Sequence, residues 1–184
     1  MRLFTAVTLG SAVEERAAAG IEQFRALAPK ARWVNPEGVH LTLVFLGEVA
    51  EARLAELAEA LTPVSHHHAP FTLTIEGGGG FGPPSHPHVL WAGVRGDTAA
   101  LEALQAEVAS VLEPLGFERD RRMYTAHLTL ARSKDSRGEQ ALGSCQRALE
   151  GEHWGEARVE HLILFESKSG RYIRRLELPL AGAL

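Results

Sequence analysis

The tetrapeptide HLTL occurs twice in this sequence, at residues 40–43 and again at 127–130. On a β-strand, residues two apart point to the same face about 7 Å from each other, so His40 shares a face with Thr42, and His127 with Thr129. The leucines of each motif then point into the opposite layer. With nine histidines in the chain, an H-x-T triplet is expected by chance only about 0.4 times. A single strand histidine is most often a core residue, but two matching copies indicate a paired function.

Two imidazoles and two hydroxyls suit a reaction that needs an acid on one side and a base on the other. The unperturbed pKa of histidine is about 6.5, so near neutral pH one ring can accept a proton while its partner donates one. In-line attack on phosphorus has this requirement, because the nucleophile and the leaving oxygen occupy opposite apices. Threonine hydroxyls can hold the non-bridging oxygens as negative charge develops on them. Neither strand carries Asp or Glu, and no third ligand lies at metal-like spacing, so we expect no metal and no cofactor.

Periodicity places both motifs on strands of an α+β fold with mostly antiparallel pairing. A capping box of Ser11 and Glu14 predicts the start of the first helix, and Asp97 is the predicted N-cap of the third. We expect the second helix to end before Pro63. The predicted strands are 2–9, 39–47, 71–75, 88–94, 124–133, 156–167 and 172–180, and the predicted helices are 11–28, 51–61, 97–115 and 137–150.

Composition favours a globular protein without a membrane span. The 184 residues are 45% hydrophobic and 23% charged, and no apolar run approaches the roughly 18 residues that a bilayer requires. The start of the chain predicts a strand and a helix in place of a signal peptide. The single Cys145 allows no internal disulfide and fits a reducing cytoplasm, and we expect a cytoplasmic monomer.

Charge is unevenly distributed along the chain, whose net charge is −4. This net charge argues against broad binding along a nucleic-acid backbone. Two basic clusters, Arg119–Arg137 and Arg171–Arg175, are either solvated surface or local sites for one or two phosphates.

Two further stretches resemble functional motifs. The segment SHHHAP, residues 65–70, resembles a metal-binding tract, but we expect a solvated connector, with a zinc hydrolase as the alternative. The segment EGGGGFGPP, residues 76–84, lacks the Gly-Lys-Ser/Thr ending of a phosphate loop, so we expect a flexible hairpin connection or a mobile rim over a cleft. Aromatic residues on strands can stack a nucleobase or fill the core. The candidates, among which the sequence does not choose, are Phe4, Trp33, Phe81, Tyr124 and Phe165.

Nearly the whole chain resembles the 2H phosphoesterases, and among them the bacterial RNA 2′,3′-cyclic phosphodiesterases, also called 2′-5′ RNA ligases. The stretches that carry the resemblance are RLFTAV, RWVNPEGVHLTLVFLGEV, HVLWAGV, HLTLAR and LILFES. Two departures are Ala126, where the family commonly has proline, and a shortened C-terminal stretch. The resemblance implies a single domain over residues 1–184 with two pseudo-symmetric lobes, in which two antiparallel sheets face a central cleft and helices cover the outer faces.

The resemblance also implies roles for individual residues. His40 would protonate the leaving oxygen and His127 would activate water, while Thr42 and Thr129 hold the phosphoryl oxygens. Arg132 is a candidate for a phosphate or RNA contact, with a rim arginine as the alternative. The implied reaction opens an RNA or nucleoside 2′,3′-cyclic phosphate to a 2′-phosphate, and relatives also join RNA ends in a 2′-5′ linkage without ATP. A non-catalytic module that binds nucleotides or RNA ends remains the alternative function.

Overall fold

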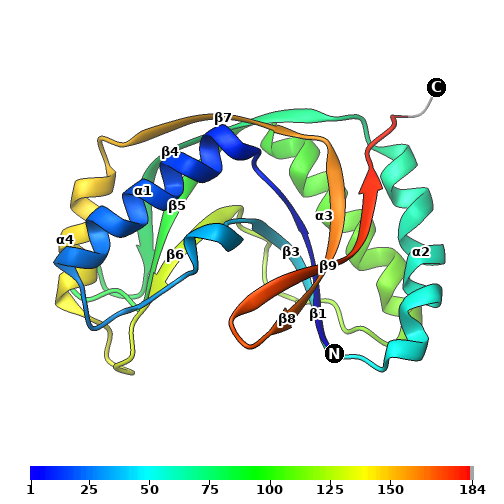
Figure 1. The fold of residues 1–184 in the computed structure, drawn as a ribbon, viewed down its shortest axis with the longest axis horizontal. Helices are drawn as coiled ribbons and strands as arrows, with labels where there is room; N and C mark the ends of the chain where they lie inside the picture. Colours follow the sequence, from blue (N-terminus) through cyan, green and yellow to red (C-terminus); the bar gives the residue numbers. More distant parts are fainter. Residues whose placement is uncertain (183–184) are drawn as a thin grey trace.

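The computed structural model describes residues 1–182, which form two antiparallel sheets with helices packed outside them (Figure 1). The four strands of the first sheet, which we call sheet A, are in order β3 (Leu41–Glu48), β1 (Arg2–Val7), β8 (His161–Lys168) and β9 (Arg171–Pro179). The five strands of sheet B are β2 (Arg32–Trp33), β6 (His127–Arg132), β5 (Val89–Gly96), β4 (Phe71–Phe81) and β7 (His153–Val159). The predicted α+β class with antiparallel pairing is confirmed.

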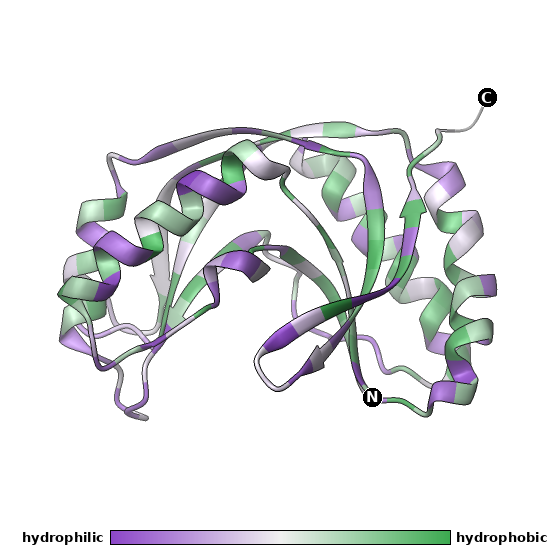
Figure 2. Ribbon diagram, viewed as in Figure 1, coloured by the Kyte–Doolittle hydropathy of each residue, from purple (hydrophilic) through white to green (hydrophobic). Residues whose placement is uncertain are grey.

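The helices divide between the two sheets. Helices α2 (Leu54–His67) and α3 (Thr98–Leu112) pack on sheet A, while α1 (Ser11–Leu27) and α4 (Gln140–Leu149) pack on sheet B. Short 3-10 turns lie at Pro36–Gly38, Glu51–Arg53 and Glu113–Leu115. In Figure 2 the helices carry both hydrophobic and hydrophilic residues, as expected when one side meets a sheet and the other meets water. None of the described helices is long and apolar enough to cross a membrane.

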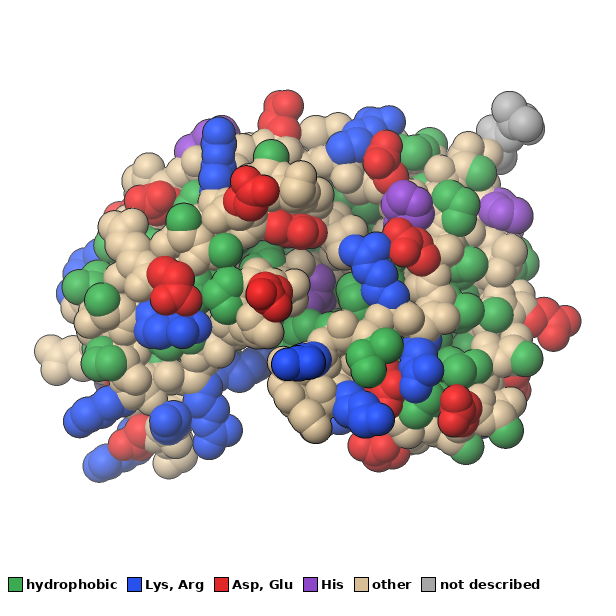
Figure 3. Space-filling model, viewed as in Figure 1, with side chains coloured by type: hydrophobic (Ala, Val, Ile, Leu, Met, Phe, Trp, Pro, Cys, Tyr) green, Lys and Arg blue, Asp and Glu red, His purple; other side chains and the backbone are tan. Residues whose placement is uncertain are grey.

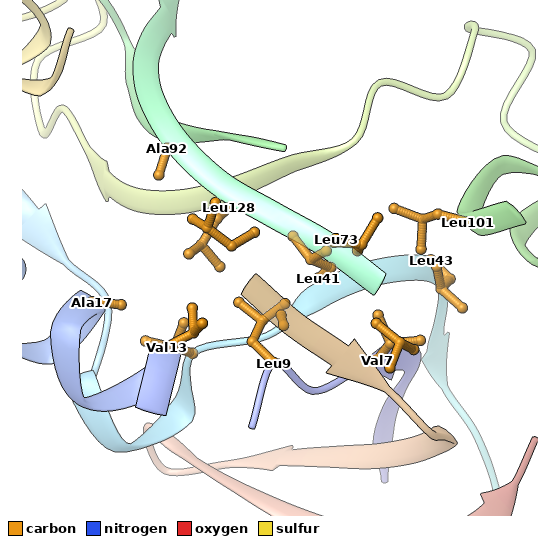
Figure 4. Close-up of a cluster of buried hydrophobic side chains, with 14 of the residues drawn as sticks. Val7, Leu9, Val13, Ala17, Leu41, Leu43, Leu73, Ala92, Leu101 and Leu128 are labelled. Atoms are coloured by element: carbon orange, nitrogen blue, oxygen red, sulfur yellow. The ribbon is translucent and has the colours of Figure 1, made fainter. Parts of the chain in front are cut away.

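One connected cluster of buried side chains runs behind both sheets, and the HLTL leucines belong to it (Figure 4). Leu41, Leu128 and Leu130 are completely buried, and Leu43 is 5% exposed. Replacing a leucine at such a position by alanine typically costs about 2–5 kcal/mol. The leucines therefore hold both motifs to the core, as the alternation of the sequence predicted.

One predicted cap and one predicted helix end are wrong, each for a local reason. Helix α1 is capped by Gly10 at φ 77°, and Ser11 is already helical. Glu14 nevertheless reaches back beyond the end, since its Oε1 accepts a hydrogen bond from the Leu9 amide at 3.3 Å. Helix α2 continues through Pro63 to His67. Pro63 and Glu59 are both exposed, so water can satisfy the Glu59 carbonyl that the proline cannot bond.

The glycine run 77–80 was predicted to be a flexible connection, but it lies inside strand β4. Strand β4 extends to Phe81. Large neighbouring groups occupy the space that side chains at the glycine positions would need. A Cβ atom at Gly78 would lie 2.7 Å from Leu149 of α4, and one at Gly79 would lie 2.3 Å from the Trp91 ring. The glycines thus allow a helix and an indole to lie directly on the strand.

The predicted strand 156–167 is in fact two strands in different sheets. Strand β7 ends at Val159 in sheet B, and β8 begins at His161 in sheet A, with Glu160 between them. A continuous apolar pattern conceals this change of sheet, because both strands bury alternate residues against the same core.

Candidate active site

His40 lies directly before strand β3, where two hydrogen bonds fix its ring. Its Nδ1 is 2.6 Å from the Gly38 carbonyl oxygen, and its Nε2 is 3.1 Å from Thr42 Oγ1. The carbonyl is presented by the 3-10 turn Pro36–Gly38, which Asn35 caps by accepting the Glu37 amide at 3.1 Å. Because Nδ1 must donate to a carbonyl, the neutral ring carries its lone pair on Nε2. His40 and Thr42 therefore share a face, as predicted.

Aromatic rings surround His40 on the open face of sheet A. The Phe4 ring centroid is 4.8 Å from that of His40, and Phe165 is 5.8 Å away. Tyr172 meets the imidazole edge-on at 4.9 Å. Burial among these groups lowers the pKa of His40 below its ordinary value of 6.5, and the bond to Gly38 offsets part of this effect. In the free protein His40 is therefore biased towards its neutral form.

We expect the His40 ring to titrate below pH 6.5 in the free protein, for the reason just given. A bound phosphate should raise the midpoint, since a nearby negative charge favours the imidazolium. The measurement is an NMR titration of the ring protons, assigned with His40→Asn, with and without a nucleoside 2′-phosphate. A midpoint that the ligand leaves unchanged would mean that no anion binds beside this ring.

His127 is held in the same way on sheet B. It is the first residue of β6, and its Nδ1 is 2.6 Å from the Thr125 carbonyl oxygen. As at His40, the acceptor is the carbonyl two residues earlier, so Nε2 again carries the lone pair of the neutral ring. The Phe81 ring meets His127 edge-on at a centroid distance of 5.0 Å.

The two motifs lie where the sheets meet. Strands β3 and β6 are in contact although they belong to different sheets. Just before β6, the Tyr124 hydroxyl donates to the Thr42 carbonyl at 3.1 Å, which ties the second motif to the first. Burial raises the pKa of Tyr124, so the phenol keeps the proton that this bond requires.

Thr129 lies on the open face of sheet B in a row with Trp91 and Gly79, because paired residues on adjacent strands point to the same side. Trp91 Nε1 is buried and has no hydrogen-bond partner within residues 1–182. Unpaired buried donors are rare in proteins, and one beside the candidate residues is available to an acceptor on a ligand.

Replacing Gly79 by alanine should displace the Trp91 indole, because the new Cβ would lie 2.3 Å from its ring carbons. We expect a loss of about 1–3 kcal/mol in the free energy of unfolding, with a changed tryptophan emission. Gly151→Ala is the matched control, since a Cβ there meets nothing within 4 Å. Equal stability of the two variants in denaturant titrations would contradict the close packing of Trp91 on β4.

Arg132 is not on the face that strict alternation assigns to it. Alternation along β6 would place Arg132 on the buried face of Leu128 and Leu130, yet its side chain is exposed. The pairing of β5 with β6 shifts between Leu90 and Trp91, which leaves Leu130 as an extra residue. Such a bulge resets the alternation. Arg132 therefore joins the face of His127, about 15 Å further along the strand, and lies opposite Arg32 of β2.

The histidine run does not form the predicted solvated connector. His66 and His67 are in the last turn of α2. His67 Nδ1 and His68 Nε2 contact the two oxygens of Glu107 on α3 at 2.7 and 2.8 Å. Within residues 1–182, no group of three or more His, Cys, Asp or Glu side chains is arranged to hold a metal.

Cys145 is buried, and burial raises the pKa of its thiol to about 11.

Several residues around the candidate site were not singled out from the sequence. Tyr172 and Trp91 are indistinguishable by pattern from core aromatics, because only the pairing of strands shows which face is open. Arg25 and Arg32 lie outside both basic clusters of the sequence, yet they line a cavity together with Arg132. The one feature of the sequence that could have pointed to Arg32 is its position, next to Trp33, shortly before the first motif.

Two antiparallel sheets that meet at paired H-x-T motifs define the class of the 2H phosphoesterases. The chain belongs to the 2′-5′ RNA ligase superfamily, whose model matches residues 13–171. An RNA 2′,3′-cyclic phosphodiesterase from Archaeoglobus fulgidus is 36% identical over 167 residues, which are 91% of each chain.

Solved structures resemble the chain over nearly its whole length. TT0787 of Thermus thermophilus superposes with a TM-score of 0.76 at 28% identity, covering 99% of both chains. Escherichia coli LigT complexed with 3′-AMP superposes with a TM-score of 0.73 at 25% identity, covering 97% of both chains. The two-sheet architecture is thus common to these proteins.

Proposed function

We propose that the protein hydrolyses the terminal 2′,3′-cyclic phosphate of RNA to a 2′-phosphate. The observation that carries this proposal is the matching construction of the two histidines. Each Nδ1 is 2.6 Å from the carbonyl oxygen two residues earlier, so each Nε2 is left to exchange protons. The relative from Archaeoglobus fulgidus, named RNA 2′,3′-cyclic phosphodiesterase, supports the same substrate.

The proposed reaction is a single in-line displacement at phosphorus. A water oxygen attacks the phosphorus atom and gives its proton to His127 Nε2. The bond from phosphorus to O3′ breaks, and His40 Nε2 protonates the departing O3′. His40 must therefore enter the reaction as imidazolium, which the negative charge of the bound phosphodiester favours against the effect of burial.

The two threonines are proposed to bind the non-bridging oxygens. Thr42 Oγ1, which is 3.1 Å from His40 Nε2 in the free protein, would turn its hydroxyl hydrogen to the phosphate. Hydrogen bonds to oxygens that gain charge lower the barrier most in a site of low dielectric constant. We propose that no metal takes part, because the imidazoles supply both proton transfers. Each lobe of a pseudo-symmetric domain would then contribute one H-x-T motif.

The test is incubation with nucleoside 2′,3′-cyclic phosphates, and with RNA that ends in one, in the presence of excess EDTA. We expect a 2′-phosphate product identified by phosphorus NMR, and a bell-shaped dependence of kcat/KM on pH. A 3′-phosphate product would contradict the proposed bond cleavage. Tight binding of a nucleoside 2′-phosphate without any turnover would instead support a binding module.

The same site is proposed also to join RNA ends by transesterification of the cyclic phosphate. A 5′-hydroxyl of a second RNA end can take the place of water, and opening of the cyclic phosphate then forms a 2′-5′ linkage without ATP. The proton transfers are unchanged, because the attacking oxygen still loses its proton to His127 and O3′ still gains one. Product length on a denaturing gel separates ligation from hydrolysis.

A further inference from the structure

A basic cavity of about 520 Å³ lies beside the candidate active site. Its charged lining residues are Arg25, Arg32 and Arg132, and it also meets Trp33 and Tyr172. We call this cavity the arginine groove. In Figure 3 the surface is hollowed between the two halves of the molecule, with Lys and Arg side chains on both sides of the hollow. A volume of this size accommodates a nucleotide.

Two arginines of this groove, Arg32 and Arg132, have no acidic partner among the described residues. Arg32 and Arg132 are paired directly across β2 and β6. Within residues 1–182, neither forms a salt bridge. Like charges directly opposite each other on neighbouring strands destabilise a sheet. An anion between them removes this repulsion, and guanidinium groups bind phosphate oxygens through paired hydrogen bonds.

Arg25 provides a second, independent indication of an anionic ligand. Its Nε is buried and has no hydrogen-bond partner in the described part of the chain, although its Nη1 lies 3.4 Å from Glu22. Buried donors are nearly always satisfied in folded proteins, by water or a ligand if not by the chain. Arg25 thus brings to the groove a guanidinium group with one unsatisfied donor.

The groove and the His40 ring share one neighbour. Tyr172 lines the groove and also packs edge-on against the His40 ring at 4.9 Å. Gly38 permits this approach, because a Cβ there would lie 2.5 Å from the tyrosine ring. Trp33 is fixed by its own hydrogen bond from Nε1 to the Ala28 carbonyl at 2.8 Å. Fixed aromatic rings beside arginines are typical of single-stranded nucleic-acid sites.

A second cavity next to Tyr172 is a poorer site for a polyanion. This hairpin cavity has a volume of about 230 Å³, and its lining includes Glu14 and Glu37 as well as Arg171 and Arg174. The carboxylates repel phosphate, whereas none of the described residues that line the arginine groove is acidic.

We propose that the arginine groove binds the RNA strand on the 5′ side of the terminal phosphate, so that the preferred substrate is an oligonucleotide. This inference rests on the proposed function, because a cyclic phosphate at a 3′ end leaves the remaining strand on its 5′ side. Arg32 and Arg25 would bind internucleotide phosphates that a mononucleotide lacks. Neither arginine is among the residues proposed to transfer protons or to hold the phosphoryl oxygens. Their loss would therefore weaken strand binding and leave turnover of a mononucleotide unaffected.

The test compares kcat/KM for a nucleoside 2′,3′-cyclic phosphate with that for a short RNA ending in the same group. We expect Arg32→Gln and Arg25→Gln each to lower kcat/KM for the oligonucleotide about tenfold, through KM, and to leave the mononucleotide unchanged. The slope of log kcat/KM against log salt concentration should also fall by about 0.7 for each arginine removed. Arg171→Gln, in the hairpin cavity, is the matched control.

The outcomes separate this inference from the proposed function. Equal kcat/KM for both substrates in the wild-type protein, unchanged in Arg32→Gln, would contradict strand binding in the arginine groove. The proposed hydrolysis would be unaffected by that result. A lower kcat/KM for the oligonucleotide in Arg171→Gln but not in Arg32→Gln would indicate that the strand binds in the hairpin cavity. That result would also contradict the inference. Absence of turnover with both substrates would overturn the proposed function itself.

Discussion

Alanine at His40 or at His127 is expected to lower kcat for the cyclic phosphate by about 10³- to 10⁴-fold, since each ring is proposed to transfer one proton in the same step. The double variant should be little worse than either single variant, because the two rings act together. Both variants should fold, since each ring is only half-buried. His153→Ala is the matched control: this exposed strand histidine of sheet B contacts Glu76 at 3.0 Å.

The roles of the two histidines can be separated with a substrate whose O3′ is replaced by sulfur. A thiolate leaves without a proton, so the residue that protonates the leaving group becomes dispensable. We expect His40→Ala to regain most of its lost rate with this substrate, and His127→Ala to regain little. Recovery in His127→Ala alone would reverse the assignment, and retention of a tenth of the wild-type rate by either variant on the normal substrate would contradict the pair mechanism.

Valine at Thr42 or Thr129 is expected to lower kcat about 10²-fold, with a smaller effect on KM. Valine keeps the branched shape but removes the hydroxyl that is proposed to bind an oxygen as its charge grows. Serine at the same positions restores a donor, so Thr42→Ser and Thr129→Ser should recover most of the activity. Steady-state kinetics of the four variants provide the measurement.

The two threonine positions should differ in one respect. Thr42 Oγ1 is 3.1 Å from His40 Nε2 in the free protein, so Thr42→Val should also alter the titration of the His40 ring. Unchanged kcat in both valine variants would exclude the hydroxyls from phosphate stabilisation. A loss of kcat in the valine variants that the serine variants share would indicate that threonine acts through packing and not through its hydroxyl.

Alternation of side chains was sufficient to predict how each motif is presented. Leucines that alternate with His and Thr can be buried only if the polar residues face the other way, and the structure confirms this for Leu41 and Leu128. Alternation did not hold at Arg132, because a bulge depends on the neighbouring strand and leaves no mark in the sequence of β6 itself. The type of each element was therefore more predictable than the pairing of strands.

Glycine and proline misled the prediction for a related reason. Both residues are read as breaks from local preference alone, yet Gly79 lies in a strand because an indole packs on it, and Pro63 lies on a solvated helix face. Tertiary contacts decide such cases. The arginine groove likewise joins Arg25, Arg32 and Arg132 from three elements, and no spacing in the chain indicates that they meet.

The order of strands in sheet A has a consequence for protein synthesis. Strand β1 lies between β3 and β8, so it pairs with a strand that is synthesised only after both HLTL motifs. A nascent chain that has reached residue 150 carries both HLTL motifs but lacks Phe165 and Tyr172, which pack around the His40 ring. Activity should therefore be absent from such a nascent chain and appear only when the β8–β9 hairpin docks.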